Sequence, residues 1–200
     1  GGLAVVTILF GTILAACLGV IAASVTILTL IALEPMITRG YDKSLASGSI
    51  VAAGTLGILI PPSIMLVVYA PQAGLSVGQM FMGAVFPGLL LSAFYMVYVV
   101  IRCRLNPALG PAIPEDQVTP FDRAKFVKLL KSLVPPVLLI IAVLGTIFLG
   151  IAPPTEAAAV GCMASILLAI GYRKFSWELM KRASLETMKV SAFVVMIAAM

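Results

Sequence analysis

The sequence predicts an all-α fold in which several helices cross a membrane and one of them is interrupted. Hydrophobic residues make up 62% of the chain and charged residues 10%, against roughly 45–50% and 25% in soluble domains. Charged residues are absent from long runs such as residues 44–101, and glycine and proline interrupt that run near residues 54–62. We therefore expect a polytopic membrane protein, and we read the chain as an internal fragment of a longer one.

The first charge-free run, residues 1–33, is longer than the roughly 20 residues that one spanning helix needs. Gly11 and Gly19 interrupt it. Two structures fit this pattern: one long tilted helix, or a hairpin that enters the membrane and turns back near residues 19–23. A turn at membrane depth requires surrounding protein or a wet cavity. Periodicity alone does not separate the two.

The second run, residues 44–101, is long enough for two spans. The turn-rich stretch APQAGLSVGQ at 70–79 divides it. We expect an interrupted transmembrane helix at 46–69 and a continuous one at 80–101. The remaining apolar runs predict transmembrane helices at 133–150 and 156–172 and the start of a further one at 187–200.

The charges of the loops predict the orientation of these spans. Lys and Arg concentrate in loops 34–45, 102–131 and 173–189, whereas 70–79 carries no charge and 151–156 carries only an acid. Because cytoplasmic loops are enriched in Lys and Arg, the three basic loops are expected to be cytoplasmic.

Two basic segments read as helices at the membrane surface. One lies in the cytoplasmic loop 102–132, where Thr119 is the expected N-cap. The other is the segment 173–186, with Ser176 as the expected N-cap. Their basic faces would lie against anionic lipid of the bilayer. Solvated connecting helices are the alternative.

Glu156 is the one acid between two of the expected spans. An intramembrane carboxylate is a candidate proton or ion site. The spacing favours a different interpretation, in which Glu156 lies in the first turn of the helix that follows Pro154. A carboxylate there complements the helix dipole and reaches water.

The stretch GTLGILIPPS carries the strongest functional signal. Proline removes a backbone donor and ends a helix, so the pair Pro61–Pro62 breaks the span near the bilayer centre. Freed carbonyls at a midplane break are what ion-coupled transporters use to hold sodium. Thr55 and Ser63 add hydroxyl groups beside the break. A packing kink satisfied by neighbouring helices is the alternative.

Several classes of function lack their motifs in this sequence. Histidine is absent, and so are HExxH, GxSxG and the phosphate-binding GxxxxGK[ST]. Cys17, Cys103 and Cys162 have no metal-binding spacing and read as thiols in apolar or juxtamembrane settings. We therefore expect no enzyme, no cofactor and no nucleic-acid partner.

Four stretches in order resemble the large membrane subunit, DctM-like, of the tripartite ATP-independent periplasmic (TRAP) transporters. They are RGYDKSLASGSIVAAG, GTLGILIPPS, GLSVGQMFMGAVFPGLLL and IAPPTEAAAVG. The resemblance implies a secondary transporter with an elevator mechanism in a bacterial inner membrane. It would take up a small organic acid or related solute with sodium as the coupling ion. A periplasmic substrate-binding protein would deliver the substrate, and a small membrane subunit would scaffold the large one.

The resemblance also implies where the ion site lies. Residues 1–37 would form a re-entrant hairpin beside the interrupted helix, and the second half of the site would lie outside this sequence. The residues expected near sodium are Gly54, Thr55, Gly57, Ile60, Pro61 and Ser63, with Gly19 and Ser24 of the hairpin opposite them.

The expected hairpin tip departs from the family pattern. Serines are common at the family's tip, whereas residues 18–24 here read LGVIAAS. The loss of these serines puts ion ligation by hydroxyl groups of the tip in doubt. The tip sequence is similar to that of the subgroup labelled for mannitol or chloroaromatic compounds. Two other functions stay open, the membrane domain of an ATP-driven transporter and a non-transporting scaffold subunit. The scaffold would need no broken midplane helix.

Overall fold

The computed structural model describes residues 1–111 and 123–198, and the regular structure of these residues is helical throughout. Within them, the helices long and apolar enough to cross a membrane are Ile21–Thr38, Val77–Leu105 and Pro154–Gly171. Shorter apolar helices cover Gly2–Leu18 and Leu133–Phe148. The predicted all-α, polytopic membrane fold is thereby confirmed.

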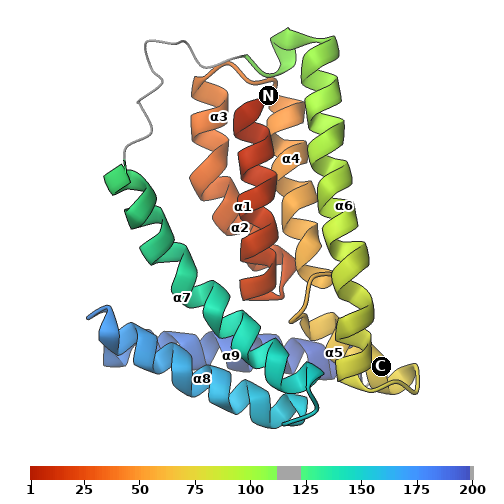
Figure 1. The fold of residues 1–200 in the computed structure, drawn as a ribbon, viewed down its shortest axis with the longest axis vertical. Helices are drawn as coiled ribbons and strands as arrows, with labels where there is room; N and C mark the ends of the chain where they lie inside the picture. Colours follow the sequence, from red (N-terminus) through yellow and green to blue (C-terminus); the bar gives the residue numbers. More distant parts are fainter. Residues whose placement is uncertain (112–122, 199–200) are drawn as a thin grey trace.

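The first charge-free run folds into two antiparallel arms (Figure 1). α1 (Gly2–Leu18) ends at Gly19, whose φ of 61° lies in the left-handed region that glycine adopts without strain. Val20 is extended, and the chain returns through α2 (Ile21–Leu28), a π-helical turn at Thr29–Leu33 and α3 (Glu34–Thr38). The run is therefore a helical hairpin that turns at Gly19–Val20.

The next segment is a helix that breaks and restarts. α4 (Lys43–Thr55) begins at Asp42, whose carboxylate accepts a hydrogen bond from the Leu45 amide at 2.9 Å. It tightens into a 3₁₀ turn at Leu56–Ile58 and resumes as α5 (Ile64–Gln72). The intervening residues 59–63 are not helical.

α6 (Val77–Leu105) is the longest helix among the described residues. It starts with a capping box in which Ser76 and Gln79 bond to each other's backbone amides. After α6 a short 3₁₀ turn, Pro107–Leu109, returns the chain to α4, and the Asp42 amide donates to the Leu109 carbonyl at 3.0 Å. The start of α4 and the end of α6 therefore lie at the same end of the bundle.

Three more helices complete the described chain. They are α7 (Arg123–Phe148), α8 (Pro154–Gly171) and α9 (Trp177–Ala198). α7 and α9 each run without a break through a basic segment and into an apolar one. α7 packs on α8, and α8 and α9 lie across the lower end of the bundle (Figure 1).

Two of the expected local features are confirmed in this part. The Ser176 hydroxyl accepts from the Leu179 amide at 3.1 Å, so Ser176 caps α9. Glu156 is exposed in the first turn of α8, after Pro154. The other expected cap, Thr119, lies outside the described residues.

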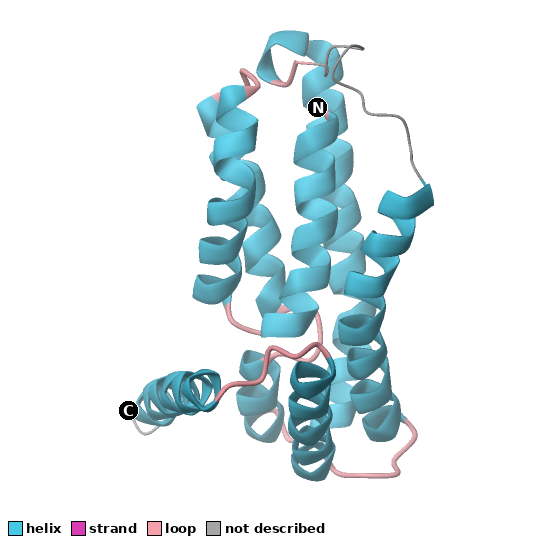
Figure 2. Cartoon of the chain, turned by 90° about the vertical axis from the view of Figure 1, so that its left-hand side faces the viewer, coloured by secondary structure: helices cyan, strands magenta, loops and turns pink. Residues whose placement is uncertain are grey.

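The main core lies among α1, the returning arm, α4 and α6. Its fully buried side chains include Ile8, Leu28, Met36 and Ile50. Tyr41 closes the open end of the hairpin, because its hydroxyl accepts from the Leu3 amide at 3.1 Å. Figure 2 shows the long helices of this bundle running roughly side by side, with their connections at the ends.

Candidate functional site

The tip of the hairpin lies directly against the break between α4 and α5. A Cβ added to Gly19 would stand 2.9 Å from the Pro62 carbonyl oxygen and 3.6 Å from the Ser63 Cα. No side chain fits at the tip, because it would meet backbone atoms that cannot rotate away. Glycine at position 19 thus serves both the left-handed turn and this contact.

Two glycines of the broken helix also allow the hairpin to approach closely. A Cβ on Gly54 would stand 2.3 Å from Val25 Cγ2 and 3.1 Å from the Val25 backbone nitrogen. A Cβ on Gly57 would stand 3.4 Å from the Ser24 hydroxyl and 3.7 Å from the Val20 backbone. The hairpin's second arm therefore packs against the broken helix almost backbone to backbone.

The hydroxyl groups at this contact differ in their hydrogen bonds. Ser24 Oγ donates to the Val20 carbonyl at 3.0 Å, and Thr55 Oγ1 donates to the Ala52 carbonyl at 2.7 Å. Ser63 is 1% exposed, and its Oγ has no hydrogen-bond partner in the described structure. A buried hydroxyl without a partner costs about 1–3 kcal/mol. Ser63 is thus the buried polar side chain at this contact that makes no hydrogen bond within the described residues.

Backbone carbonyls supply further oxygens at the break. In an uninterrupted helix the carbonyls of Gly57 and Ile58 would accept from the amides of residues 61 and 62, but both are prolines and have no N–H. Two helices also begin here, α2 after Val20 and α5 after Ser63. The site therefore combines freed carbonyls, which attract cations, with two helix N-termini, which attract anions.

The wall behind the break is apolar and lies at the middle of α6. Ile60 is 7% exposed and packs in a cluster with Ala15 and Leu56. A Cβ on Gly88 of α6 would stand 2.9 Å from Ile60 Cγ1. Gly88 is near the centre of the charge-free part of α6, so the break contacts this helix near its midpoint.

The residues predicted for the ion site fall into two groups. In the first group Gly19 lies against Ser63, and Gly57 lies against Ser24, at the contact between the hairpin and the broken helix. The other predicted residues act as surroundings: Gly54 packs on the second arm, Thr55 bonds its own helix, and Ile60 and Pro61 are buried in the wall.

The sequence did not identify the residues that fix the hairpin, the broken helix and α6 against one another. Val20 and Val25 meet the broken helix, and Gly88 meets its wall. Thr12 of α1 and Ser92 of α6 are both buried and share a hydrogen bond of 2.6 Å between their hydroxyls. A serine deep inside an apolar span is the signal that could have identified this pair.

Acidic and imidazole ligands do not cluster here. Among the described residues there is no group of three or more His, Cys, Asp or Glu side chains that could hold a metal ion. An ion at the break would therefore be held by carbonyl and hydroxyl oxygens. Such ligands suit sodium, which ion-coupled transporters bind at the freed carbonyls of discontinuous helices.

Comparison with known proteins gives a consistent result along the whole chain. A family model described as "Tripartite ATP-independent periplasmic transporter, DctM component" matches residues 1–200. The C4-dicarboxylate TRAP transporter large permease protein DctM of Vibrio cholerae is 38% identical over 169 residues, covering 84% of this chain and 36% of that protein. Its namesake from Pseudomonas aeruginosa is 36% identical over 202 residues, covering 100% of this chain and 45% of that protein.

A further relative is the isethionate TRAP transporter permease protein DctMQ of Oleidesulfovibrio alaskensis, 31% identical over 201 residues. The match covers 100% of this chain and 31% of that protein. The chain thus spans less than half the length of each of these three relatives. The matches confirm the resemblance carried by GTLGILIPPS and the three other stretches.

Proposed function

The chain belongs to the DctM family of TRAP transporter components, and we propose that it carries one half of a sodium-coupled solute site in a large permease subunit. The related proteins are transporter permeases, which fits a membrane protein that is not an enzyme. In this proposal the hairpin Gly2–Thr38 is re-entrant, and the break between α4 and α5 lies at the bilayer midplane.

The observation that carries the proposal is the unpartnered hydroxyl of Ser63. It is buried beside a break whose two prolines deprive the Gly57 and Ile58 carbonyls of their helical donors. Such a group is unfavourable in an apolar interior unless a ligand satisfies it. A sodium ion bound by these oxygens would satisfy the hydroxyl and the carbonyls together.

Sodium would act by bridging the hairpin tip and the broken helix, which are separate elements of the fold. Gly19 and Ser24 come from the hairpin, whereas Gly57 and Ser63 come from the broken helix. An ion held between them would stabilise the contact between the hairpin tip and the break. The N-termini of α2 and α5 would then remain free to face the substrate. Helix N-termini attract anions, which suits an organic acid as the substrate.

The names of two relatives support an organic acid as the proposed substrate. C4-dicarboxylate and isethionate in those names are organic acids. We propose that this chain works in a bacterial inner membrane with a small membrane subunit and a periplasmic substrate-binding protein. The loops 34–45, 102–131 and 173–189 would face the cytoplasm, as their positive charges predict.

Uptake by proteoliposomes tests the proposal. The full-length subunit would be reconstituted with its small partner and loaded binding protein, under a sodium gradient and without ATP. Gly57→Leu should abolish uptake, because its branches would enter the space of Ser24 and Val20. Gly83→Leu is the matched control, since a Cβ there meets nothing within 4 Å. Uptake that does not depend on sodium and requires ATP would instead favour an ATP-driven transporter. The absence of any uptake would favour a scaffold.

A further inference from the structure

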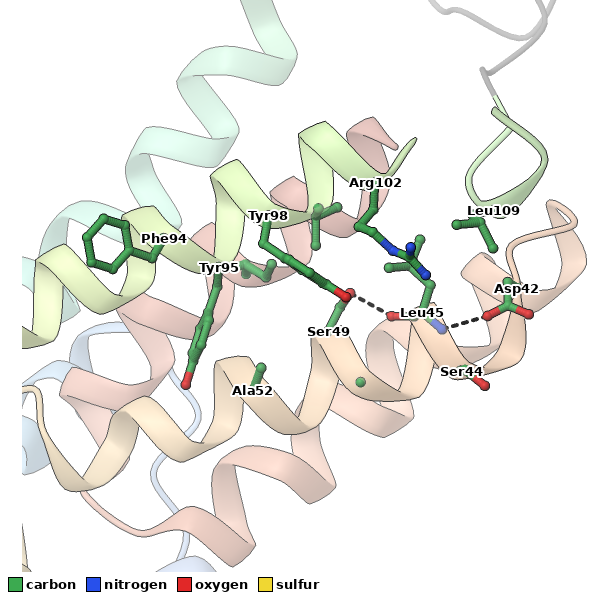
Figure 3. Close-up of a pocket in the computed structure, with 13 residues that line it drawn as sticks. Asp42, Ser44, Leu45, Ser49, Ala52, Phe94, Tyr95, Tyr98, Arg102 and Leu109 are labelled. Carbon is green, nitrogen blue, oxygen red and sulfur yellow. Dashed lines mark hydrogen bonds between the residues drawn. The ribbon is translucent and has the colours of Figure 1, made fainter. Parts of the chain in front are cut away.

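A groove between α4 and α6, outside the proposed ion site, has the chemistry of a lipid site. It has a cavity volume of about 520 Å³. Figure 3 shows Phe94, Tyr98 and Arg102 along one wall, from α6, and Ala52 and Leu45 along the other, from α4. Phe94 and Tyr98 are 59% and 58% exposed, so none of the described residues closes the side of the groove.

The mouth of the groove carries one charge of each sign. Asp42 caps the start of α4 and Arg102 lies in the last turn of α6, and the fold brings them to the same end of the bundle (Figure 3). The ion pairs in the described residues are Glu178–Arg182 and Glu186–Lys189, so Asp42 and Arg102 are not paired with each other. The mouth therefore offers a cation and an anion to a ligand.

The carboxylate and guanidinium at the mouth are only partly engaged. Asp42 uses Oδ1 to accept from the Leu45 amide at 2.9 Å, which leaves its second oxygen available. Arg102 is exposed in the last turn of α6. Guanidinium groups bind phosphate through parallel hydrogen bonds, and carboxylates accept from ammonium groups.

The apolar part of the groove matches part of one leaflet. Phe94, Tyr98 and Arg102 are spaced four residues apart on one face of α6, which spans about 12 Å at 1.5 Å per residue. One leaflet of the hydrocarbon core is about 15 Å thick. A chain lying over Tyr98 and Phe94 would therefore run from the charged mouth toward the bilayer centre.

We propose that this groove binds a zwitterionic phospholipid with a primary ammonium headgroup, of the phosphatidylethanolamine type. Its phosphate would bind Arg102, its ammonium would bind Asp42, and one acyl chain would lie over Tyr98 toward Phe94. A purely anionic lipid would satisfy Arg102 but bring its charge against Asp42. The inference does not depend on sodium coupling, because it concerns a separate surface and a different ligand.

Lipid retention tests the charged mouth. The full-length subunit with its small partner would be placed in nanodiscs of equal parts phosphatidylethanolamine, phosphatidylglycerol and phosphatidylcholine, then extracted, and its bound lipids counted by mass spectrometry. Arg102→Gln should lower bound phosphatidylethanolamine about tenfold, as expected for loss of a charged hydrogen bond. Arg104→Gln is the matched control, because Arg104 shares the last turn but does not line the groove.

Asp42→Asn tests recognition of the ammonium group separately from recognition of the phosphate. Asparagine still caps a helix, so α4 should remain folded. The variant should lose the preference for phosphatidylethanolamine over phosphatidylcholine while retaining phospholipid. Equal retention of the three lipids by the wild type, or an equal effect of Arg104→Gln, would overturn the proposal.

Two further variants test the apolar part. Gly48 lines the groove, and a Cβ there meets nothing within 4 Å, so Gly48→Leu should fill the groove without disturbing α4 and should lower lipid retention. A benzoylphenylalanine at position 98 should crosslink to lipid. A crosslink to the polypeptide of the complete subunit alone would show that protein covers the groove and would overturn the proposal.

Discussion

α1 and α8 are both apolar and have 17 and 18 residues, yet their packing differs. In α8 one residue, Ala157, is buried. In α1 the buried residues are Ala4, Thr7, Ile8, Gly11, Thr12 and Ala15. α1 belongs to the bundle that includes the hairpin and the broken helix, whereas α8 contacts mainly α7.

The difference shows that apolar character alone does not determine which helices build a site. A helix in a membrane needs no protein around its apolar side chains, and α8 leaves Val160 and Met163 63% and 67% exposed. α1 is buried because small residues let its neighbours approach. A Cβ on Gly11 would stand 2.6 Å from the Ala53 Cβ. Close approach of this kind distinguishes the bundle that carries the candidate site.

The largest contrast is expected from one substitution placed in both regions. Ile8 of α1 is 0% exposed and Ile170 of α8 is 51% exposed. Ile8→Ala should cost about 2–5 kcal/mol of unfolding free energy through the cavity it leaves. Ile170→Ala should change it by less than about 0.5 kcal/mol. Unfolding of the purified complex in detergent measures both, and equal losses would contradict the contrast.

A smaller effect, with opposite signs, is expected for two glycines on α4. Gly54→Ala places a methyl group 2.3 Å from Val25 Cγ2 and should destabilise the protein by about 1–3 kcal/mol. Gly48→Ala meets nothing within 4 Å and should stabilise α4 by roughly 0.5–1 kcal/mol. The same unfolding assay compares them. Two changes of the same sign would mean that the hairpin does not pack on Gly54.

The smallest effect concerns the hydroxyl pair between α1 and α6. A double-mutant cycle of Thr12→Val and Ser92→Ala should give a coupling of about 0.6 kcal/mol, the average for hydrogen bonds between membrane helices. Thr26 is the control, because its hydroxyl bonds to Ala22 on its own helix. Coupling between Thr26→Val and Ser92→Ala should be absent. A Thr12–Ser92 coupling of zero would remove this pair from the account.

The apolar runs and the turn residues made much of the fold predictable. The gap between α5 and α6, residues 73–76, lies within the predicted divider at 70–79, and the capping box of Ser76 and Gln79 starts α6 there. Uninterrupted α7 was not foreseen. The pair Pro135–Pro136 stands where its basic and apolar segments meet, and the helix continues through it, so a proline pair does not by itself end a helix.

The candidate site was predictable as a backbone break but not as a set of contacts. Because proline has no backbone N–H, Pro61 and Pro62 predict the missing hydrogen-bond donors directly from the sequence. Which hydroxyl stays without a partner depends on tertiary distances, so Thr55 and Ser63 looked equivalent in the sequence. In the structure Thr55 bonds to its own helix and Ser63 has no partner.

The stability of the complex against sodium concentration tests the central claim most directly. Wild-type full-length subunit with its small partner should unfold at higher temperature as sodium rises, and not as potassium rises, with about 2.7 kcal/mol of stabilisation at a hundredfold excess over Kd. Ser63→Ala should lose most of this shift. Ser49→Ala should keep it, because the Ser49 hydroxyl already donates to the Leu45 carbonyl at 2.6 Å. If Ser63→Ala retained the full sodium shift, the break would be a packing feature and the claim would be wrong.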